Sequence, residues 1–527
     1  MLDPMGLISI SCLAYVIYQI LLTAYNLWFH PLRRHPGPWR WAASRIPLTT
    51  STIRGRYVHD IKDMHRKYGH VVRIAPNELS FTDERAWADI CGATSAAPYG
   101  MKKDERLNDL VGGDATNPDL AREKSDMKHT RLRKALSPAF SKSSLRQQET
   151  LIAGHVDEMV AVLGQSETQG QKVNMVHVYA FTIYDIFSQL FLGESMDLLR
   201  QDTARPWVDS MTGFAKATTA IAALSHYTIA RVLITIALKF LGTGPRDAFM
   251  DPCFRRFDRR MESTSTSTST GTTAVAQPDL VHFALSGKTQ LTSKELRDFS
   301  PFLMIGGGET MASLLPCLTY LLLKHPKVLS RLVCEVRNAF GPCTITPPPT
   351  STCPTAATRT TTPLTMDAVL GLPYLAACIN EALRLYPPVV QGNERVVPAG
   401  GAVVCGAPLP GGALVVASHL ATYRQKRNFF RPDHYLPERW LPAEAGAEFA
   451  GDRKGAFKPF SVGPQSCFGQ EIAHYTMRLV VCKLLLTFDL SLCPESDDKE
   501  AWGGDLAAYN VWMKPALMVK LKRVTGT

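Results

Sequence analysis

The sequence predicts a mainly α-helical protein with small β-sheets, built as one large domain behind a membrane-spanning helix. Apolar residues recur every three or four positions through long windows, for example at 151–163 and 314–336, which is typical of helices packed against a core. Strand patterns are short and few, at 70–82, 395–420 and 516–524. Because no internal repeat or linker divides the body, a single domain is the simplest interpretation.

The N-terminal segment is long and apolar enough to cross a membrane. Met5 to Trp28 are twenty-four residues without a charged side chain, against the roughly 20 that a helix needs to cross the hydrocarbon core. Asp3 precedes the segment and no small-residue cleavage site stands out, which favours an uncleaved anchor over a secretory signal peptide. We therefore expect a transmembrane anchor over residues 1–29.

A basic, proline-rich stretch follows the anchor. Arg33, Arg34 and Arg40 lie directly after it, so the positive-inside rule predicts that the body faces the cytosol. The prolines within residues 30–40 cannot extend a helix, and they predict a short stiff strap between the anchor and the body.

Charge and cysteine patterns limit the compartment and the partners. The chain has a net charge of +11 without a concentrated basic arm, which favours acidic partners or membrane lipid over nucleic acid. Its 12 cysteines are scattered singly, so a disulfide framework is not expected and reduced thiols fit the cytosolic side. Within the body, 41–527, the low-complexity stretches 263–273 and 341–363 are predicted to be surface loops, because they cannot bury apolar area.

The stretch "FSVGPQSCFG" (460–469) holds one cysteine in a glycine-flanked loop. A lone cysteine is often a small buried hydrophobe. Here the helical pattern of 468–488 places Cys467 at a helix N-terminus, where the helix dipole stabilises a thiolate. Gly463 helps to shape a tight turn, and Gly469 lets something flat approach the backbone. A thiolate that faces a flat group is expected to be a haem ligand.

A second pattern lies in "LPYLAACINEALRLYPP" (372–388). Glu381 and Arg384 are three residues apart, so they share one face of the helix and can pair. Because the neighbouring residues are mostly apolar, a buried pair is plausible and would need a further donor. Arg439, in "PERW", is the candidate, and we interpret this network as structural.

A third pattern is "MIGGGET" (304–310), in which three successive glycines weaken a helix by roughly 3 kcal/mol. One interpretation is a helix that opens locally over a flat cofactor, with the Thr310 hydroxyl and the Glu309 carboxylate placed to handle protons. The alternative is that the glycines separate two helices. This segment alone does not decide between them.

Together and in this order, these motifs resemble the cytochrome P-450 superfamily of haem-thiolate monooxygenases. "FSVGPQSCFG" is similar to its cysteine loop, "EALR" to its Glu-x-x-Arg helix, "PERW" to its following arginine segment and "GGGET" to its oxygen-activating helix. "HTRLRKALSPAFS" (129–141) resembles its haem-propionate helix. The resemblance covers nearly the whole chain. It is strongest to fungal microsomal enzymes of secondary metabolism, such as the trichothecene hydroxylase group.

The resemblance implies a role for each motif. It makes Cys467 the axial ligand of the iron of haem b, and Thr310 and Glu309 a proton relay to dioxygen. An electron-rich thiolate favours cleavage of the O–O bond. The resemblance also implies the salt-bridge network of Glu381, Arg384 and Arg439, propionate contacts from His129, Arg133 and Arg395, and haem contacts from Phe460, Gly463 and Gly469.

Three residues depart from the family pattern. Gln465 occupies a position where the family usually has a cation that binds a haem propionate. The remaining cations are therefore expected to contribute more to propionate binding. Met311 replaces a second hydroxyl residue after Thr310. Pro316 lacks an N–H and predicts a kink in the same helix.

The implied activity is insertion of one oxygen atom from dioxygen into a lipophilic secondary-metabolite intermediate, by hydroxylation or epoxidation. No nicotinamide or flavin fingerprint is found, so electrons are expected from an NADPH-dependent flavoprotein reductase in the endoplasmic reticulum membrane. Lys454 and Lys458 are candidate docking residues and equally ordinary solvated charges. The alternatives are a reductase-independent haem-thiolate isomerase or dehydratase, and a decayed haem protein.

The resemblance also predicts where the substrate pocket lies. We expect its walls to come from about 95–125, from 205–245, from the glycine-rich helix near Phe302 and from 389–393. These segments are mainly apolar, which predicts a lipophilic substrate.

Overall fold

A computed structural model describes residues 4–95, 97–104, 120, 123, 125–201, 205–241, 244–270, 279–286, 291–341, 363–392, 394–442, 446–497, 502 and 504–524. The α-helices are α1 Pro4–Ala24, α2 Trp39–Ala43, α3 Ile46–Ile53, α4 Tyr57–Tyr68, α5 Arg85–Cys91, α6 Asp126–Leu136, α7 Lys142–Gln147, α8 Glu149–Thr168, α9 Met175–Leu192, α10 Arg205–Leu224, α11 Thr228–Leu241, α12 Gly244–Thr270, α13 Leu280–Ser286, α14 Ser293–Leu303, α15 Thr310–Lys324, α16 Pro326–Phe340, α17 Met366–Leu370, α18 Pro373–Leu385, α19 His419–Tyr423 and α20 Gln470–Thr487. The predicted mainly helical fold is confirmed.

The strands form four small sheets. The largest has the order β1-β2-β8-β5-β3, in which only the β2–β8 pair is parallel, and the others have the orders β4-β12-β9, β6-β7 and β10-β11. The strands are β1 Val71–Ala75, β2 Glu78–Phe81, β3 Lys102–Lys103, β4 Val173–Asn174, β5 Arg395–Val396, β6 Ala402–Val404, β7 Ala407–Leu409, β8 Leu414–Ala417, β9 Phe488–Leu492, β10 Ala508–Tyr509, β11 Val511–Trp512 and β12 Met518–Arg523. The three predicted strand regions are confirmed.

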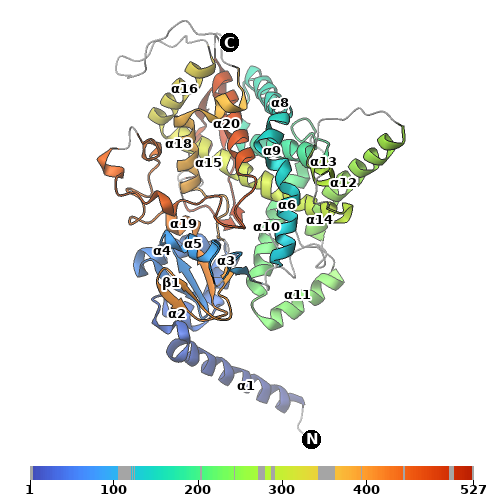
Figure 1. The fold of residues 1–527 in the computed structure, drawn as a ribbon. Coiled ribbons are helices and arrows are strands. Elements are labelled where there is room, and N and C mark those ends of the chain that lie inside the picture. The colour runs from blue at the N-terminus through green and yellow to red at the C-terminus, as the bar shows by residue number, and fades with distance from the viewer. Residues whose placement is uncertain are drawn as a thin grey trace.

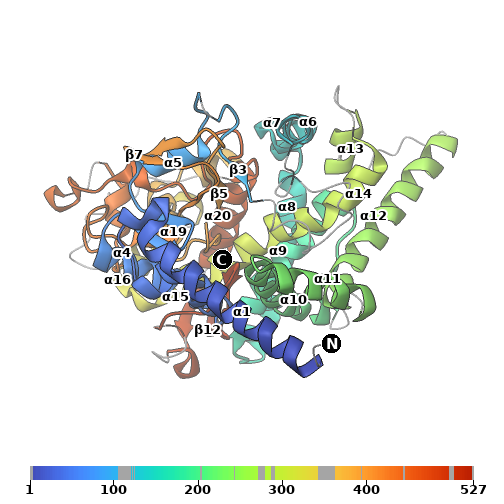
Figure 2. The same ribbon diagram turned by 90° about the horizontal axis from the view of Figure 1, so that it is seen from below.

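The sheet that contains β1 and the helical bulk occupy different parts of the molecule (Figure 1). The sheet lies with α2, α4 and α5 at the lower left, whereas α8, α9, α15, α16, α18 and α20 fill the upper part. Seen from below, α1 crosses this end of the molecule, close to the side on which α10 and α11 lie (Figure 2).

Burial separates the anchor from the core helices. Three helical segments are long and apolar enough to cross a membrane, at Ser9–Phe29, Met175–Leu192 and Ser293–Lys324. The first is 6% buried, against 83% and 72% for the others. A helix that is apolar on all sides and enclosed by protein belongs to a core. Only the N-terminal segment therefore remains a candidate membrane span among the described residues.

The strap is more ordered than a simple spacer. The anchor helix ends in a π-helical turn, Tyr25–Phe29, followed by a 3₁₀ helix, Pro31–Arg34. The Arg73 N–H then donates to the Pro36 carbonyl at 2.7 Å. A Cβ at Gly37 would collide with the Arg73 carbonyl, so glycine permits this close approach. The strap packs directly on β1 and continues into α2.

The first predicted loop, 263–273, is wrong over most of its length, because α12 continues to Thr270. The earlier part of this helix buries Phe249 and Phe257 in the core. Once a helix is nucleated, each added residue gains a backbone hydrogen bond, so serine and threonine can prolong it despite their modest propensity. Residues 271–273, and 342–362 of the second predicted loop, lie outside the described residues.

Candidate active site

The cysteine loop is held by its own backbone. The Cys467 N–H donates to the Phe460 carbonyl at 2.9 Å, and the Ser466 N–H donates to the Gly463 carbonyl at 3.0 Å. Gly463 has a φ of +77°, and a Cβ there would collide with the Cys91 carbonyl at the end of α5. The tight turn predicted at Gly463 is confirmed, and glycine is required there by packing against α5.

Space beside the sulfur fits a flat group. The nearest atoms to a Cβ at Gly469 would be the Ile472 Cγ2 at 3.7 Å and the Cys467 Sγ at 3.9 Å, so nothing crowds this side of the loop. The Phe460 ring packs on the imidazole of His474, with ring centroids 5.0 Å apart. Cys467 is accessible and precedes the first residue of α20 by three positions.

The protonation of Cys467 depends on opposing influences. Burial raises the pKa of its thiol, whereas the Gly469 backbone N–H and the Arg133 guanidinium lower it, and the net direction is upward. The backbone N–H of Gly469 at the start of α20 acts in the direction that the sequence predicted, since it lowers the pKa of the thiol. Coordination to a metal cation deprotonates a thiol outright, so the donor fits an iron ligand.

Four basic side chains gather beside this loop. Arg133, on α6, donates to the Ser466 carbonyl at 2.5 Å, and Arg395, on β5, donates to the Gln465 side-chain oxygen at 3.0 Å. Lys103, on β3, is directly opposite Arg395 in an antiparallel pair, a position where like charges are destabilising. Burial, together with Lys103, Arg133 and Arg395, lowers the pKa of His129 to about 4.

This basic cluster, consisting of His129, Arg133, Arg395 and Lys103, fits the carboxylates of a haem. Among the described residues, neither Arg133 nor Arg395 forms an ion pair. Lys103 was not identified from the sequence, because a two-residue strand has no periodic pattern. Gln465, which replaces the cation that is usual in the family, accepts a hydrogen bond from Arg395 through its amide oxygen and so orients that guanidinium.

The three glycines lie in a local opening of one long helix. Residues Met304–Glu309 form a π-helical segment between α14 and α15, which supports the first interpretation of this motif. A Cβ at Gly307 would collide with the Phe187 ring, and one at Gly308 with the Tyr184 ring. These two glycines therefore allow α9 to pack closely. Only Gly306 is exposed.

Thr310 closes the π-helical segment. Its hydroxyl donates to the Gly306 carbonyl at 2.9 Å. The next residue, Met311, is 2% exposed and packs in the hydrophobic core. α15 runs through Pro316 without interruption, and the predicted kink stays a prediction.

Glu309 is held by three donors. The Lys514 Nζ lies 2.6 Å from its Oε1, which also accepts from the Ser313 hydroxyl at 3.0 Å. The Tyr184 hydroxyl donates to Oε2 at 2.8 Å. The Glu309–Lys514 pair was not identified from the sequence, because 205 positions separate the partners.

The predicted network around Glu381 is confirmed. Its carboxylate accepts from Arg384 at 2.7 and 2.9 Å and from the Arg439 Nε at 3.0 Å, and all three side chains are fully buried. Trp440 donates to Oε2 at 2.9 Å, and Arg439 also pairs with Asp452 at 2.5 Å. Burial alone would raise the pKa of Glu381, but the two arginines outweigh it and the pKa is lowered.

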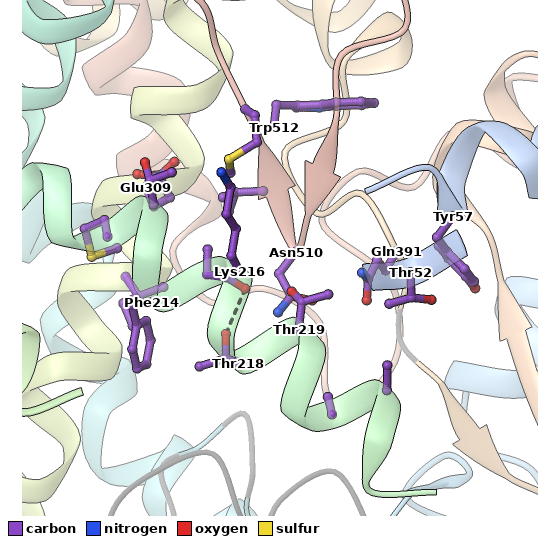
Figure 3. A pocket seen from close by; sticks show the side chains of 18 of the residues that line it. Thr52, Tyr57, Phe214, Lys216, Thr218, Thr219, Glu309, Gln391, Asn510 and Trp512 are labelled. Carbon is purple, nitrogen blue, oxygen red and sulfur yellow. Dashed lines mark hydrogen bonds between the residues drawn. The ribbon is translucent and has the colours of Figure 1, made fainter. Parts of the chain in front are cut away.

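A cavity of about 870 Å³ lies beside the glycine-rich segment. Figure 3 shows Glu309 and Phe214 at one side of it, Gln391 and Thr52 at the other, and Asn510 between them. The lining includes parts of three of the segments predicted for the substrate pocket, namely α10, Phe302 and Gln391. From 95–125, only Lys103 and Asp104 are found, and 105–119 lies outside the described residues. The lining also includes residues of α3 and the segment 510–514 with Lys514, which no sequence pattern predicted.

Comparisons with known proteins identify the class and then the family. A fold with a cysteine at a helix end, a basic cluster beside it and an opened helix defines a haem-thiolate protein. A model described as "Cytochrome P450" matches residues 36–510. The cytochrome P450 monooxygenase FUM2 of Gibberella moniliformis is 34% identical over 511 residues, which cover 95% of this chain and 99% of that protein. The averantin hydroxylase of Dothistroma septosporum is 34% identical over 509 residues, covering 96% and 90%.

A third relative is the cytochrome P450 monooxygenase aneG of Aspergillus aculeatus, 33% identical over 517 residues that cover 97% of this chain and 91% of that protein. The chain therefore belongs to the cytochrome P450 family. It is a haem-dependent monooxygenase that uses a redox partner, oxygen and a lipophilic substrate, and these comparisons do not favour the isomerase or decayed alternatives.

Proposed function

We propose that this protein inserts one oxygen atom into a lipophilic secondary-metabolite intermediate, by hydroxylation or epoxidation, with haem b held by Cys467. The observation that carries this proposal is the accessible Cys467 thiol before α20, with the basic cluster beside it. A thiolate ligand favours O–O cleavage when haem is bound.

The surrounding residues have distinct proposed roles. His129, Arg133, Arg395 and Lys103 would hold the propionates by charge-assisted hydrogen bonds, while Phe460, Gly463 and Gly469 would shape the loop that presents Cys467 to the haem. The Thr310 hydroxyl would donate a proton to dioxygen once it turns from the Gly306 carbonyl. Glu309 would relay the replacing proton from the Lys514 ammonium, its ion-pair partner, which would take up a proton from solvent in turn.

The partner and the compartment follow from the charges. Electrons would come from an NADPH-dependent flavoprotein reductase, whose acidic face suits the exposed Lys454 and the half-buried Lys458 near the cysteine loop. α1 would anchor the chain in the endoplasmic reticulum membrane, with the body in the cytosol. The apolar residues exposed on α11 support contact with the same bilayer: Ile229, Val232, Leu233, Ile236 and Phe240.

Carbon monoxide binding tests the ligand. The reduced holoenzyme should show the red-shifted Soret band of thiolate coordination, and Cys467→Ala should lose it. Cys334→Ala is the matched control, because Cys334 is a partly buried cysteine on α16 and its removal should leave the band intact. Retention of the band by Cys467→Ala would overturn the proposal.

Turnover tests the reaction. Incubation with lipophilic intermediates of a fungal pathway should give a product that carries one added oxygen, labelled from ¹⁸O₂, only when the reductase and NADPH are present. Product formation without oxygen or reductase would instead support the isomerase alternative.

A further inference from the structure

The hairpin formed by β10 and β11 is one wall of the cavity. Asn510 and Trp512 of this hairpin line the cavity, and Lys514 follows them and pairs with Glu309. Figure 3 shows Asn510 and Trp512 between Glu309 on one side and Tyr57 on the other. Contacts that hold the hairpin in place therefore also set the shape of the cavity and the position of Lys514.

The hairpin packs against α4 and against the turn that precedes this helix. The Ala508 N–H, in β10, donates to the Gly55 carbonyl at 2.9 Å. Trp512, in β11, packs on the imidazole of His59, with ring centroids 5.8 Å apart. His59 lies on α4 and is 5% exposed. A buried histidine therefore supports the strand that lines the cavity.

Both ring nitrogens of His59 face acceptors in the segment that leads into β10. Nε2 lies 2.8 Å from the Leu506 carbonyl, and Nδ1 lies 2.9 Å from the Asp505 Oδ1. A carbonyl and an ionised carboxylate can only accept hydrogen bonds, so each nitrogen carries a proton in this arrangement. A histidine with two N–H groups is the positively charged imidazolium. The contact is therefore an ion pair between α4 and the hairpin segment.

The other titratable groups at this contact are Asp505, Lys62 and Tyr386. The hydrogen bond with His59 is the largest influence that lowers the pKa of Asp505. Lys62, on α4, lies 3.3 Å from the Asp505 Oδ1. Tyr386 packs on Trp512, and burial raises the pKa of its hydroxyl, so Tyr386 is neutral. Among these groups, an imidazolium is the one that ordinarily loses its charge near neutral pH.

Loss of one proton from His59 would reverse the interaction with Asp505. The Leu506 carbonyl keeps the proton on Nε2, so a neutral imidazole would point the Nδ1 lone pair at the carboxylate, 2.9 Å away. The attraction between opposite charges would then become a repulsion between a lone pair and an anion. Because Lys62 would still pair with Asp505, the hairpin should loosen rather than detach.

We propose that His59 is a pH-dependent clamp on the β10–β11 hairpin, closed while the imidazolium pairs with Asp505 and loosened when the pH rises and the proton leaves. An ordinary histidine titrates at about 6.5, so the clamp should be tighter at pH 6 than at pH 8. The inference goes beyond the proposed oxygenation. Its consequence for substrate binding rests on that proposed function, because it takes the cavity as the substrate pocket.

Hydrogen–deuterium exchange of the full-length holoenzyme tests the clamp directly. After correction for the intrinsic pH dependence of exchange, protection of the Ala508 and Met513 amides should fall about tenfold between pH 6 and pH 8, the worth of one charge-assisted hydrogen bond. His59→Gln should abolish this fall, because glutamine carries no charge to lose. Arg56→Gln is the matched control, since Arg56 forms an exposed ion pair with Asp60 at the start of the same helix, and it should keep the fall.

Asp505→Asn distinguishes a clamp from a merely structural pair. The asparagine amide can donate to Nδ1 of a neutral imidazole, so protection at pH 8 should be at least as high as in the wild type. Any of four results would overturn the inference: no fall in the wild type, an equal fall in the amides of α15, an unchanged fall in His59→Gln, or lower protection in Asp505→Asn at pH 8. The carbon monoxide spectrum of the same preparations reports on the proposed function separately.

Discussion

The Glu381 network and the basic cluster beside Cys467 use the same residue types in opposite ways. In the Glu381 network, the carboxylate accepts hydrogen bonds from Arg384, Arg439 and Trp440. Its pKa is lowered although the side chain is completely buried. In the basic cluster, Lys103 and Arg395 are paired on the neighbouring strands β3 and β5. Burial and neighbouring cations lower the pKa of His129 to about 4.

The difference separates a structural site from a ligand site. The Glu381 network is complete within the chain, since Arg384 also donates to the carbonyls of Tyr423 and His434 at 2.9 Å. In the basic cluster, by contrast, neither Arg133 nor Arg395 forms an ion pair among the described residues, and both make hydrogen bonds to the cysteine loop. A carboxylate ligand would supply the charge-assisted hydrogen bonds that these two arginines lack.

The largest expected effect is loss of one member of the Glu381 network. Glu381→Gln should destabilise the fold by about 3 to 5 kcal/mol, because it leaves the buried Arg384 without its counter-charge, whereas Arg439 keeps Asp452. Urea unfolding followed by circular dichroism measures this effect. Arg146→Gln is the control, since Arg146 and Asp367 form an exposed pair whose loss should cost less than about 1 kcal/mol. Equal costs would contradict the structural role.

The Glu309–Lys514 pair shares one property with each region. Its opposite charges balance, as in the Glu381 network, but both side chains line the cavity. Lys514→Met should destabilise the protein by about 3 kcal/mol, since the carboxylate keeps only two hydroxyl donors. Adding Glu309→Gln should recover most of that loss. A double-mutant cycle on unfolding free energies measures the coupling, and additive single effects would show that the ion pair contributes nothing.

These two regions also show what the sequence could predict. The spacing of Glu381 and Arg384 on one helix predicted their ion pair, and Arg439 of "PERW" was the predicted further donor. Asp452 and Lys514 were not predictable, because each comes from a distant segment placed by tertiary packing. Long periodic helices such as α8 were predicted for the same local reason. Two-residue strands such as β3 were not, because their pairing is set by neighbouring strands.

Thr219 shows the same limit inside the cavity. Thr218 and Thr219 are adjacent and identical in type, so no sequence pattern distinguishes them. Only the structure shows that one hydroxyl bonds within its helix and the other does not. The side-chain hydrogen bonds of two adjacent threonines therefore depend on the folded structure and not on a local sequence pattern.

The basic cluster should respond to mutation in the opposite sense to the Glu381 network. Arg395→Leu should leave the unfolding free energy of the haem-free chain unchanged within about 1 kcal/mol, because it removes a buried cation whose desolvation offsets its hydrogen bonds. It should accelerate haem transfer to apomyoglobin about tenfold, since a charge-assisted hydrogen bond is worth roughly 1.5 to 3 kcal/mol.

Arg85→Leu is the control for this experiment, because Arg85 is an exposed arginine that pairs with Asp83, and it should not alter haem transfer. An unchanged transfer rate in Arg395→Leu would show that Arg395 does not contact the propionates. A large loss of chain stability would instead place Arg395 with the structural arginines.

The pKa of His65 is lowered mainly by burial, with a smaller effect of His70, whereas three neighbouring cations add to burial at His129. Its Nδ1 lies 2.8 Å from the Gly69 carbonyl and its Nε2 lies 2.8 Å from the Ser80 hydroxyl. The carbonyl can only accept, so Nδ1 carries the proton and Nε2 accepts from Ser80. Burial, the largest influence, lowers the pKa of His65 to about 4.

Because the folded pKa of His65 is below the unfolded value of 6.5, the unfolded chain binds the proton first as the pH falls. The contribution of His65 to stability is therefore complete above pH 6.5 and is lost as the pH falls toward 4. Between pH 7 and pH 5, this loss should be roughly 1 to 2 kcal/mol. Urea unfolding at both pH values should show a smaller pH dependence in His65→Gln than in the wild type. An identical pH dependence in the two proteins would mean that His65 titrates alike in the folded and unfolded states.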